Sequence, residues 1–391
     1  MRVLVACSLG GAGHLHPLLP FLGAAQRRGD ETLVVGPPAL RAMVEETGFS
    51  FHAGAEPAEE EVAAIRDRLP TAPVAEASLL GNRELFGRLA TTAMLPAMEQ
   101  VCGAWRPDLV LREPCEYASA VVGSRRGIKT SQVAISLAAG EAGSIAMAAP
   151  ALEEHRLGLV EELRRSPYLT RFPASLDPSP FPVTIRFRPP TAPAGATLPD
   201  WWKGSVAPCV YMSFGTVLGY MSIAGDVYRA VLKAAAGLDV RAVMTVGRQF
   251  DPSALGPIPD NVRVEAWVEQ DDALAWADVV VCHGGSGTAF GAMAAGVPVV
   301  AVPLFADQFD NGRRIADAGA GVVVESRPGP AGRRRSPITT LDAPRIARGI
   351  ETVLGHASYR SQARRVAAEI ASALTVDEVL ASLLSGAGIE T

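Results

Sequence analysis

The chain has 391 residues, 48% of them hydrophobic, and this length and apolar content predict two domains rather than one core. A formal charge of −5 and a pI near 5.8 exclude the basic surface of a nucleic-acid-binding protein. Five scattered cysteines without a C-x-x-C pair argue against structural zinc, and the lack of an apolar run of about 18 residues argues against membrane insertion, so we expect a cytoplasmic protein.

Strands and helices alternate from the N-terminus onward. Residues 2–8 (RVLVACS) are typical of a buried strand, residues 16–29 of the helix after it, and residues 31–38 of a second strand. Residues 106–114 and 127–136 add later strands. This β-α-β rhythm predicts an α/β fold with a parallel sheet covered on both faces.

The rhythm fades over residues 136–182, and residues 188–208, rich in Pro and Gly, indicate a linker. Alternation restarts with strands at 209–215, 240–247 and 277–284. Two doubly wound halves predict a ligand site outside the carboxyl ends of their strands. From about residue 342 the chain is helical, but its path is not readable from the sequence.

A histidine follows the first strand, in GGAGHLHPLLP. His16 stands where the third glycine of a dinucleotide-binding G-x-G-x-x-G would be, which disfavours an oxidoreductase. His14 lies at the strand-to-helix turn, where a neutral imidazole with a pKa of about 6.5 can accept a proton. The alternative is a histidine that only caps the helix.

Two further strand ends carry side chains suited to a nucleotide. Ser213, Gly215 and Thr216 form a small turn that could touch a diphosphate. Trp267 could offer a flat face to a base, although a core tryptophan is an equal alternative.

The most informative segment is VVVCHGGSGTAFGAMAAGVPVV, residues 279–300. We expect a buried strand to end at His283, a glycine turn to follow, and a helix to run over 288–295. The start of a helix offers unpaired N–H groups and the positive end of the helix dipole, and glycines let an anion approach the backbone closely. Phosphate is therefore the expected ligand. His283 can add a donor, and Ser286 or Thr288 a hydroxyl. A plain tight turn is the alternative.

In VPLFADQFDN we expect a buried strand to end in Asp307 and Gln308, with Asn311 one turn later. A carboxylate beside an amide can bind several sugar hydroxyls, although a helix cap is the alternative. Together with the anion turn, the pair predicts a phosphorylated sugar as ligand.

These motifs resemble a known family, the inverting nucleotide-sugar glycosyltransferases of natural-product biosynthesis, and among them the enediyne (calicheamicin-type) deoxysugar transferases. The resemblance is carried by W267-V-E-Q, H283-G-G-S-G-T, G296-V-P and D307-Q308-x-x-N311, with 24 residues between His283 and Asp307. It implies the GT-B fold, two Rossmann-like doubly wound parallel-sheet domains facing across a cleft. The implied ranges are 1–198 for acceptor binding, 199–207 for the linker, 208–375 for donor binding and 376–391 for a helical tail.

The resemblance also implies residue roles. His14, in the G-H-x-x-P context, would be the catalytic base, oriented by Glu113 where the family has Asp, with Glu116 as the fallback. For the donor, Trp267 and Val268 would bind the base, and Asp307 and Gln308 would bind the sugar. The diphosphate would be bound by two turns, which comprise His283, Gly285, Ser286, Gly287 and Thr288, and Ser213, Gly215 and Thr216.

Two departures from the family pattern are informative. Glu269 replaces the usual proline. Gly291 stands where plant UDP-sugar enzymes carry the glutamate that accepts hydrogen bonds from both ribose hydroxyls. A 2′-deoxyribose would not need this contact with two hydroxyls, so we expect a dTDP-sugar as donor. No D-x-D motif occurs, so we expect no metal and no cofactor.

The expected reaction is a single displacement in which His14 deprotonates a hydroxyl of a large apolar acceptor. The Ala-, Leu- and Met-rich segments 54–100 and 136–182 would form the walls of the acceptor-binding pocket. A homodimer is left open. Two alternatives share the fold: a sugar-nucleotide epimerase, which would convert the donor alone, and a non-catalytic partner of another transferase.

Overall fold

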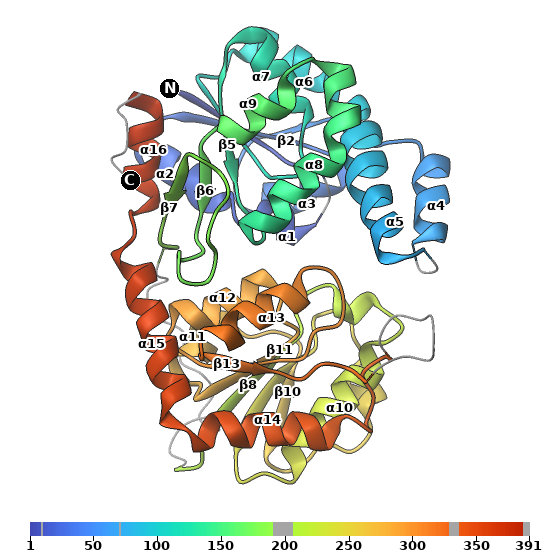
Figure 1. Cartoon of the computed structure of the whole chain (residues 1–391), viewed down its shortest axis with the longest axis vertical. Helices are drawn as coiled ribbons and strands as arrows, with labels where there is room; N and C mark the ends of the chain where they lie inside the picture. Colours follow the sequence, from blue (N-terminus) through green and yellow to red (C-terminus); the bar gives the residue numbers. More distant parts are fainter. Residues whose placement is uncertain (9–10, 70–71, 191–205, 328–335, 386–391) are drawn as a thin grey trace. The chain divides into compact units, whose positions relative to one another are not determined.

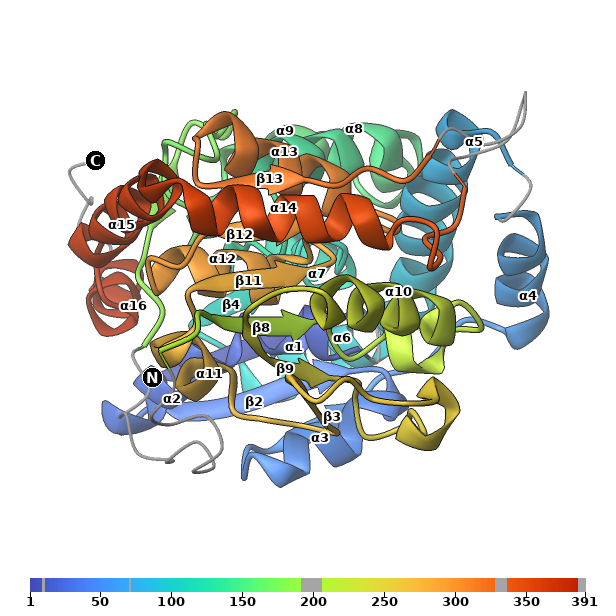
Figure 2. The same ribbon diagram turned by 90° about the horizontal axis from the view of Figure 1, so that it is seen from below.

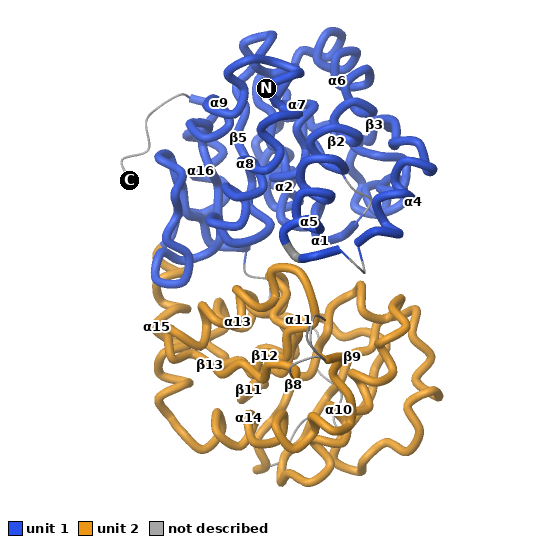
Figure 3. The backbone as a smooth tube through the Cα atoms, turned by 45° about the vertical axis from the view of Figure 1, so that its right-hand side comes forward, with its two compact units in different colours: residues 1–190, 373–391 blue, residues 191–372 orange. Residues whose placement is uncertain are grey.

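The computed structural model describes residues 1–8, 11–69, 72–190, 206–327 and 336–385. The chain divides into two compact units (Figure 1, Figure 3). Unit 1 comprises Met1–Pro190 and Ala373–Thr391, and unit 2 comprises Thr191–Ser372. Most of the predicted linker, 199–207, lies outside the described residues.

In its described part, unit 1 is built on a seven-stranded parallel sheet. The strands are β1 (Arg2–Ala6), β2 (Glu31–Gly36), β3 (Phe51–Ala53), β4 (Leu109–Arg112), β5 (Lys129–Val133), β6 (Tyr168–Thr170) and β7 (Thr184–Arg186). Their order is β3-β2-β1-β4-β5-β6-β7, and every neighbouring pair is parallel. Val3 and Val5 of β1 pack into the core on one face, whereas Leu4 and Ala6 pack on the other. Burial on both faces explains the continuous apolar run of this strand.

Helices cover both faces of this sheet (Figure 1). Phe21 and Leu22 belong to the core on one face, and Met94 and Met98 to the core on the other. The helices are α1 (Ala12–Leu15), α2 (Leu19–Arg27), η1 (Pro38–Leu40), α3 (Arg41–Glu46), α4 (Glu59–Arg68), α5 (Val74–Leu79), the π-helix η2 (Leu80–Ala90), α6 (Thr91–Trp105), α7 (Ala118–Arg126), α8 (Ala138–His155), α9 (Leu159–Arg165) and α16 (Val376–Ser385).

The C-terminal helix α16 belongs to unit 1 and packs beside α2 (Figure 1). Val379 and Leu380 are fully buried in the core that α2 also lines. At the surface, Arg27 forms an ion pair with Asp377 at 2.8 Å. The C-terminal end of the chain therefore completes one face of the first sheet.

The described part of unit 2 is built on a six-stranded sheet whose neighbouring strands are likewise all parallel. The strands are β8 (Cys209–Ser213), β9 (Arg241–Thr245), β10 (Val262–Glu265), β11 (Val279–Cys282), β12 (Val299–Ala301) and β13 (Gly321–Val323). Their order is β10-β9-β8-β11-β12-β13. The predicted pair of Rossmann-like parallel sheets is thereby confirmed.

The helices of unit 2 also lie on both faces of its sheet. They are η4 (Leu218–Tyr220), α10 (Ala224–Ala236), η5 (Pro252–Leu255), α11 (Gln270–Trp276), α12 (Ser286–Ala294), α13 (Gln308–Asp317), α14 (Ala343–Gly355) and α15 (Ala357–Ser372). Neighbouring helices α10 and α14 pack against one face (Figure 2), and α12 lies on the other.

Both sheets reverse their winding beside their first strand. In unit 1 the reversal lies between β1 and β4, and in unit 2 between β8 and β11. The loops that leave two such strands run in opposite directions, so a ligand can reach the carboxyl ends of the strands between them. His14 and Glu113 follow β1 and β4, whereas Ser213 and His283 end β8 and follow β11. The sequence motifs therefore fall at the binding position of each sheet.

Two element boundaries differ from the sequence predictions. The strand expected to end in Asp307 and Gln308 ends at Ala301, as β12, and Asp307 instead stands at the N-cap position of α13 without a side-chain capping hydrogen bond. Helix α12 begins at Ser286 rather than at Thr288. Before α13 the apolar run continues through Leu304 and Phe305 beyond the end of β12, and before α12 the glycines carry no periodic pattern, so the pattern alone misplaces both boundaries.

Candidate active site

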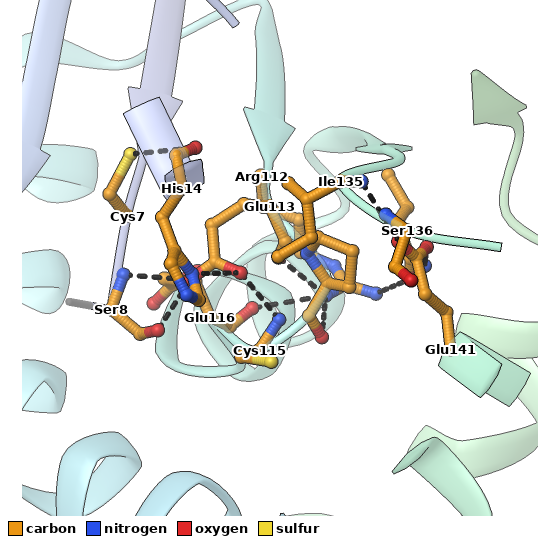
Figure 4. Close-up of polar contacts among 12 residues, drawn as sticks. Cys7, Ser8, His14, Arg112, Glu113, Cys115, Glu116, Ile135, Ser136 and Glu141 are labelled. Carbon is orange, nitrogen blue, oxygen red and sulfur yellow. Dashed lines mark hydrogen bonds and ion pairs between the residues drawn. The ribbon is translucent and has the colours of Figure 1, made fainter. Parts of the chain in front are cut away.

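His14 and Glu113 lie against each other at the switch point of unit 1. His14 is in the short helix α1, and Glu113 is the first residue after β4. Nδ1 of His14 lies 3.2 Å from Oε2 of Glu113 (Figure 4). The His14 side chain is 19% exposed, whereas the Glu113 side chain is fully buried. Because Nδ1 faces the carboxylate, Nε2 is the nitrogen left to accept a proton.

Three hydrogen bonds fix the carboxylate of Glu113. Oε1 accepts from the Ser8 backbone N–H at 2.9 Å and from the Ser8 hydroxyl, and Oε2 accepts from the Cys115 N–H at 2.7 Å (Figure 4). The extra methylene relative to aspartate still brings the carboxylate to ion-pair distance of His14. The alignment of Nδ1 with Oε2 is poorer than in a well-formed hydrogen bond, although the two atoms lie at ion-pair distance.

The pair shifts the pKa of both partners. Burial lowers the pKa of His14, but the charge and hydrogen-bonding of Glu113, with a contribution from Glu141, outweigh it and leave the pKa raised. Burial raises the pKa of Glu113, but the charge of His14 and the donors of Ser8 and Cys115 outweigh it and hold the pKa below its usual value. The imidazole is therefore a stronger base than a free histidine.

Glu116, the fallback partner, faces away from His14. Its carboxylate accepts from the Ser119 N–H at 3.0 Å and from the Ser119 hydroxyl, close to the start of α7. Burial raises its pKa to about 6. Of the two carboxylates in this loop, Glu113 is the one that lies beside the imidazole.

A buried arginine holds the loop that carries Glu113. The Arg112 guanidinium donates through Nη1 to the carbonyls of Glu113, Pro114 and Glu116 at 3.1–3.2 Å. Through Nη2 it donates to Oε1 of Gln132 at 2.5 Å. The sequence analysis missed this role, although a charged residue inside the apolar strand LVLR was a readable signal.

The network continues from β5 to the start of α8. Gln132 donates to Oε2 of Glu141 at 3.0 Å, and Oε1 of Glu141 accepts from the N–H groups of Ile135 and Ser136 at 2.8 and 2.7 Å (Figure 4). Burial raises the pKa of Glu141 to about 8. Glu141 thus ties the loop after β5 to the loop after β4, and nothing in the sequence pattern indicated it.

In unit 2, His283 lies between two glycines. A Cβ added at Gly215 would stand 3.0 Å from Cε1 of the imidazole, and one added at Gly285 would stand 2.3 Å from Nε2. Gly284 has a φ of +84°, and a Cβ there would meet the Gln308 carbonyl at 2.7 Å. The glycines are therefore needed to seat the ring beside the start of α12.

His283 is neutral at physiological pH. Burial lowers its pKa to about 4, against the opposing charge of Asp307 and a backbone contact with Ser213. Its Nδ1 is buried and has no hydrogen-bond partner among the described residues. A neutral imidazole carries one N–H donor, which suits an anionic oxygen.

Behind the helix start, a buried amide joins the two predicted ligand motifs. The side chain of Asn311, which is fully buried, donates to the carbonyl of Gly284 at 2.9 Å, to Ser286 Oγ at 3.2 Å and to Asp307 Oδ2 at 3.0 Å. Ser286 Oγ also donates to Asp307 Oδ2 at 3.2 Å. The structure therefore brings Ser286 and Asp307 together, with Asn311 as their common support.

Gln308 is turned toward its own loop. Its side chain is buried, and Oε1 accepts from the N–H groups of Leu304 and Phe305 at 2.9 and 3.0 Å. Asp307 is only partly buried. Of the predicted sugar-binding pair, Asp307 is the more accessible residue.

Trp267 is a surface residue, so the core alternative is wrong. Its side chain is 45% exposed, its indole N–H donates to Glu269 at 3.1 Å, and the Arg248 guanidinium lies 5.6 Å from the ring centre. Val268 packs near Val243 of β9. Glu269, which replaces the family's proline, orients the indole.

The side chain of Gln270 lies over Gly291. A Cβ at Gly291 would stand 2.5 Å from Nε2 of Gln270, which donates to the Gly287 carbonyl at 3.4 Å. A glutamate at position 291 would have to displace this amide. Of the remaining predicted residues, Gly287 and Thr288 lie in the first turn of α12, Ser213 pairs with Cys282 at the end of β11, and Thr216 is exposed.

In the described ranges, no group of three or more His, Cys, Asp or Glu side chains is placed to hold a metal ion. Nor is any helix in the described part of the chain both long enough and apolar enough to cross a membrane.

Comparisons with known proteins match both units. The N-terminal domain model of erythromycin biosynthesis protein CIII-like proteins matches residues 24–208, and their C-terminal domain model matches residues 229–385. An L-demethylnoviosyl transferase of Streptomyces niveus is 31% identical over 376 residues, which cover 94% of this chain and 94% of that protein.

Solved structures share the fold. The spinosyn rhamnosyltransferase SpnG, complexed with thymidine diphosphate or with spinosyn aglycone, is 25% identical and covers 98% of this chain and 100% of its own, with TM-scores of 0.76 and 0.77. The calicheamicin glycosyltransferase CalG4 covers 99% of both chains with a TM-score of 0.78, and at 21% identity it supports the fold alone.

Proposed function

The chain belongs to the family of erythromycin biosynthesis protein CIII-like glycosyltransferases, and we propose that it transfers a deoxysugar from a dTDP-sugar to a hydroxyl of a large apolar natural-product aglycone, with inversion. The observation that carries this proposal is the His14–Glu113 pair, 3.2 Å apart at the switch point of unit 1. An imidazole whose pKa is raised, and which a buried carboxylate orients, can act as the general base that activates a hydroxyl nucleophile.

The proposed reaction is a single displacement. Nε2 of His14 takes the proton of the acceptor hydroxyl while the oxygen attacks the anomeric carbon from the face opposite the nucleotide. The bond between the anomeric carbon and the diphosphate oxygen breaks, dTDP leaves with its electron pair, and the configuration inverts. Glu113 stabilises the imidazolium that forms.

The charge that develops on the diphosphate would be met in unit 2. The backbone N–H groups at the start of α12 and the neutral His283 supply donors that are already in position before reaction. Asp307, which is partly exposed and whose carboxylate accepts from Ser286, would accept from sugar hydroxyls. This set of donors supports a transfer that needs no metal ion.

The choice of dTDP rests on two observations. Gly291 offers no carboxylate to ribose hydroxyls, and the amide of Gln270 fills the space that a glutamate there would need. SpnG, which shares the fold over nearly the whole chain, binds thymidine diphosphate. Polyketide and enediyne aglycones are the acceptor classes that we propose to assay, the first because SpnG is complexed with spinosyn aglycone and the second because of the motif resemblance in the sequence.

Calorimetry on the full-length protein, in the presence of a chelator, tests the donor assignment. We expect dTDP to bind more tightly than UDP, and the chelator to leave dTDP binding unchanged. UDP binding as tightly as dTDP would overturn the nucleotide assignment. In the His14→Ala variant we expect dTDP binding to persist while turnover falls by roughly 10²- to 10⁴-fold.

A further inference from the structure

Arg171 carries a charge that the described chain does not neutralise. It is the first residue after β6, its side chain is partly buried, and its Nε is buried without a hydrogen-bond partner among the described residues. Its contact within the described chain is with the face of the Phe172 ring, 5.5 Å from the guanidinium carbon to the ring centre. Burial lowers its pKa to about 10, with no carboxylate acting against that effect.

Arg171 differs from other arginines of unit 1 in the terminal nitrogens of its guanidinium, because the Nε atoms of Arg112 and Arg186 are likewise buried without a partner. The fully buried Arg112 makes four hydrogen bonds to oxygen acceptors. Exposed arginines such as Arg66, paired with Glu59 at 2.7 Å, have carboxylate partners. A guanidinium has five donors and no acceptor, and removing it from water without a partner destabilises the folded state. A native protein can retain an unpaired, partly buried guanidinium at a site where a bound ligand supplies the missing hydrogen-bond acceptor.

Arg171 lies at the edge of the sheet that carries the proposed base. The strands of unit 1 are parallel, so the loops after β1, β4, β5 and β6 all leave from the same edge. Burial, together with the charge of the Arg171 guanidinium, lowers the pKa of His16, which lies between β1 and β2. The loops after β1 and β6 therefore lie along the same edge of the sheet as Glu113 and His14.

We propose that Arg171 anchors an anionic oxygen of the acceptor, a carboxylate or an ionised phenol, in a subsite bordered by His16. The inference rests on the proposed function and adds the chemistry of the acceptor to it. The guanidinium fork matches both oxygens of a carboxylate, and Phe172 beneath it limits its movement. A neutral carbonyl would satisfy a donor but leave the partly buried charge uncompensated.

Binding of a matched pair of probes tests the proposal on the full-length protein. The probes are 6-hydroxy-2-naphthoic acid and its methyl ester, which differ in one negative charge, and the readout is the naphthol fluorescence at neutral pH. We expect the acid to bind at least about tenfold more tightly than the ester, as for a charge-assisted hydrogen bond. We expect Arg171→Met to abolish this preference and to leave ester affinity unchanged.

Three controls separate the proposal from other roles. Arg66→Met removes one exposed positive charge and should keep the preference for the acid. Arg171→Lys keeps the charge without the fork and should retain a reduced preference. Because the guanidinium has no partner in the described chain, Arg171→Met should not lower the melting temperature.

Equal binding of acid and ester by the wild-type protein would overturn the subsite. A fall in dTDP affinity in Arg171→Met, with the acid preference intact, would also overturn it, because the guanidinium would then serve the nucleotide. Measuring dTDP binding by the wild-type protein in parallel separates this failure from that of the proposed function. Tight dTDP binding without acid preference rejects the subsite alone, and failure to bind dTDP rejects the donor assignment.

Discussion

At the scale of single residues, two histidines are tuned in opposite directions. His14 faces a buried carboxylate, which raises its pKa against the effect of burial. For His283 burial prevails over the charge of Asp307, and the pKa falls to about 4. The first imidazole is thereby suited to accept a proton, and the second stays neutral and serves as a hydrogen-bond donor.

The tuning of His14 predicts a change in the pH profile. The base acts only when it is neutral, so kcat/KM should rise with pH through its raised pKa. Glu113→Gln removes the charge that raises this pKa, and burial then lowers it, so the acidic limb should move to lower pH. We also expect kcat to fall by roughly 10²-fold or more. Glu116→Gln, which alters a buried carboxylate turned away from His14, should leave the acidic limb of the pH profile unchanged. An acidic limb that also stays unchanged in Glu113→Gln would contradict the assignment of Glu113.

The seating of His283 predicts a loss of nucleotide affinity. We expect His283→Ala to weaken dTDP binding by about tenfold to a hundredfold, the range for one hydrogen bond to a charged group, when measured by calorimetry. His356→Ala, an exposed histidine of the same unit, is the matched control and should bind dTDP as the wild type does. Equal affinity in both variants would remove His283 from the diphosphate site.

At the scale of elements, the loop after β4 is held by its own strand. Arg112 is the last residue of β4, and its guanidinium donates to three carbonyls of the following loop and to Gln132 of β5. Gln132 in turn donates to Glu141 of α8. The carboxylate of Glu113 therefore points at His14 without depending on a long flexible connection.

Loss of this arginine should affect stability and turnover together. Arg112→Met leaves three carbonyls and the Gln132 oxygen without their donor, so we expect a loss of about 3–5 kcal/mol in the free energy of unfolding. Arg126→Met, which breaks an exposed ion pair with Glu99, should cost about 0–1 kcal/mol. Chemical denaturation compares the two. A loss in Arg112→Met no larger than in the control would show that the network does not hold the loop.

The sequence predicted the long elements and the strand-end motifs because buried parallel strands form continuous apolar runs. It missed β3, β6, β7 and β13, each of only three residues, which is too short for a period to appear. It placed Asp307 at a strand end rather than at the start of α13. The partners of Arg112 lie up to 20 residues away and come together only through the parallel pairing of β4 with β5, which composition does not encode.

At the scale of the whole molecule, the two sheets repeat one strand order, and each carries its polar side chains at its own switch point. Unit 1 is completed by α16, which follows the whole of unit 2 in the chain. The sequence pattern could not place this helix, because an amphipathic helix shows that it packs but not on which sheet. The fold of unit 1 therefore depends on the far end of the chain.

This dependence predicts unequal effects from two changes at the contact between α2 and α16. Leu380→Ala removes a fully buried side chain, and we expect a loss of about 2–5 kcal/mol in the free energy of unfolding. Arg27→Ala breaks the exposed ion pair with Asp377 and should cost about 0–1 kcal/mol. Thermal melts of both variants test this, and a Leu380→Ala protein as stable as the wild type would show that α16 is dispensable to unit 1.

Inverting transfer by a base held on Glu113 is tested by NMR of the products formed from dTDP-α-D-glucose and dTDP-β-L-rhamnose, with and without a panel of polyketide and enediyne aglycones. We expect a glycoside of inverted anomeric configuration that forms only when acceptor is present and that is lost in His14→Ala. A glycoside of retained configuration, or conversion of the donor without acceptor, would contradict it.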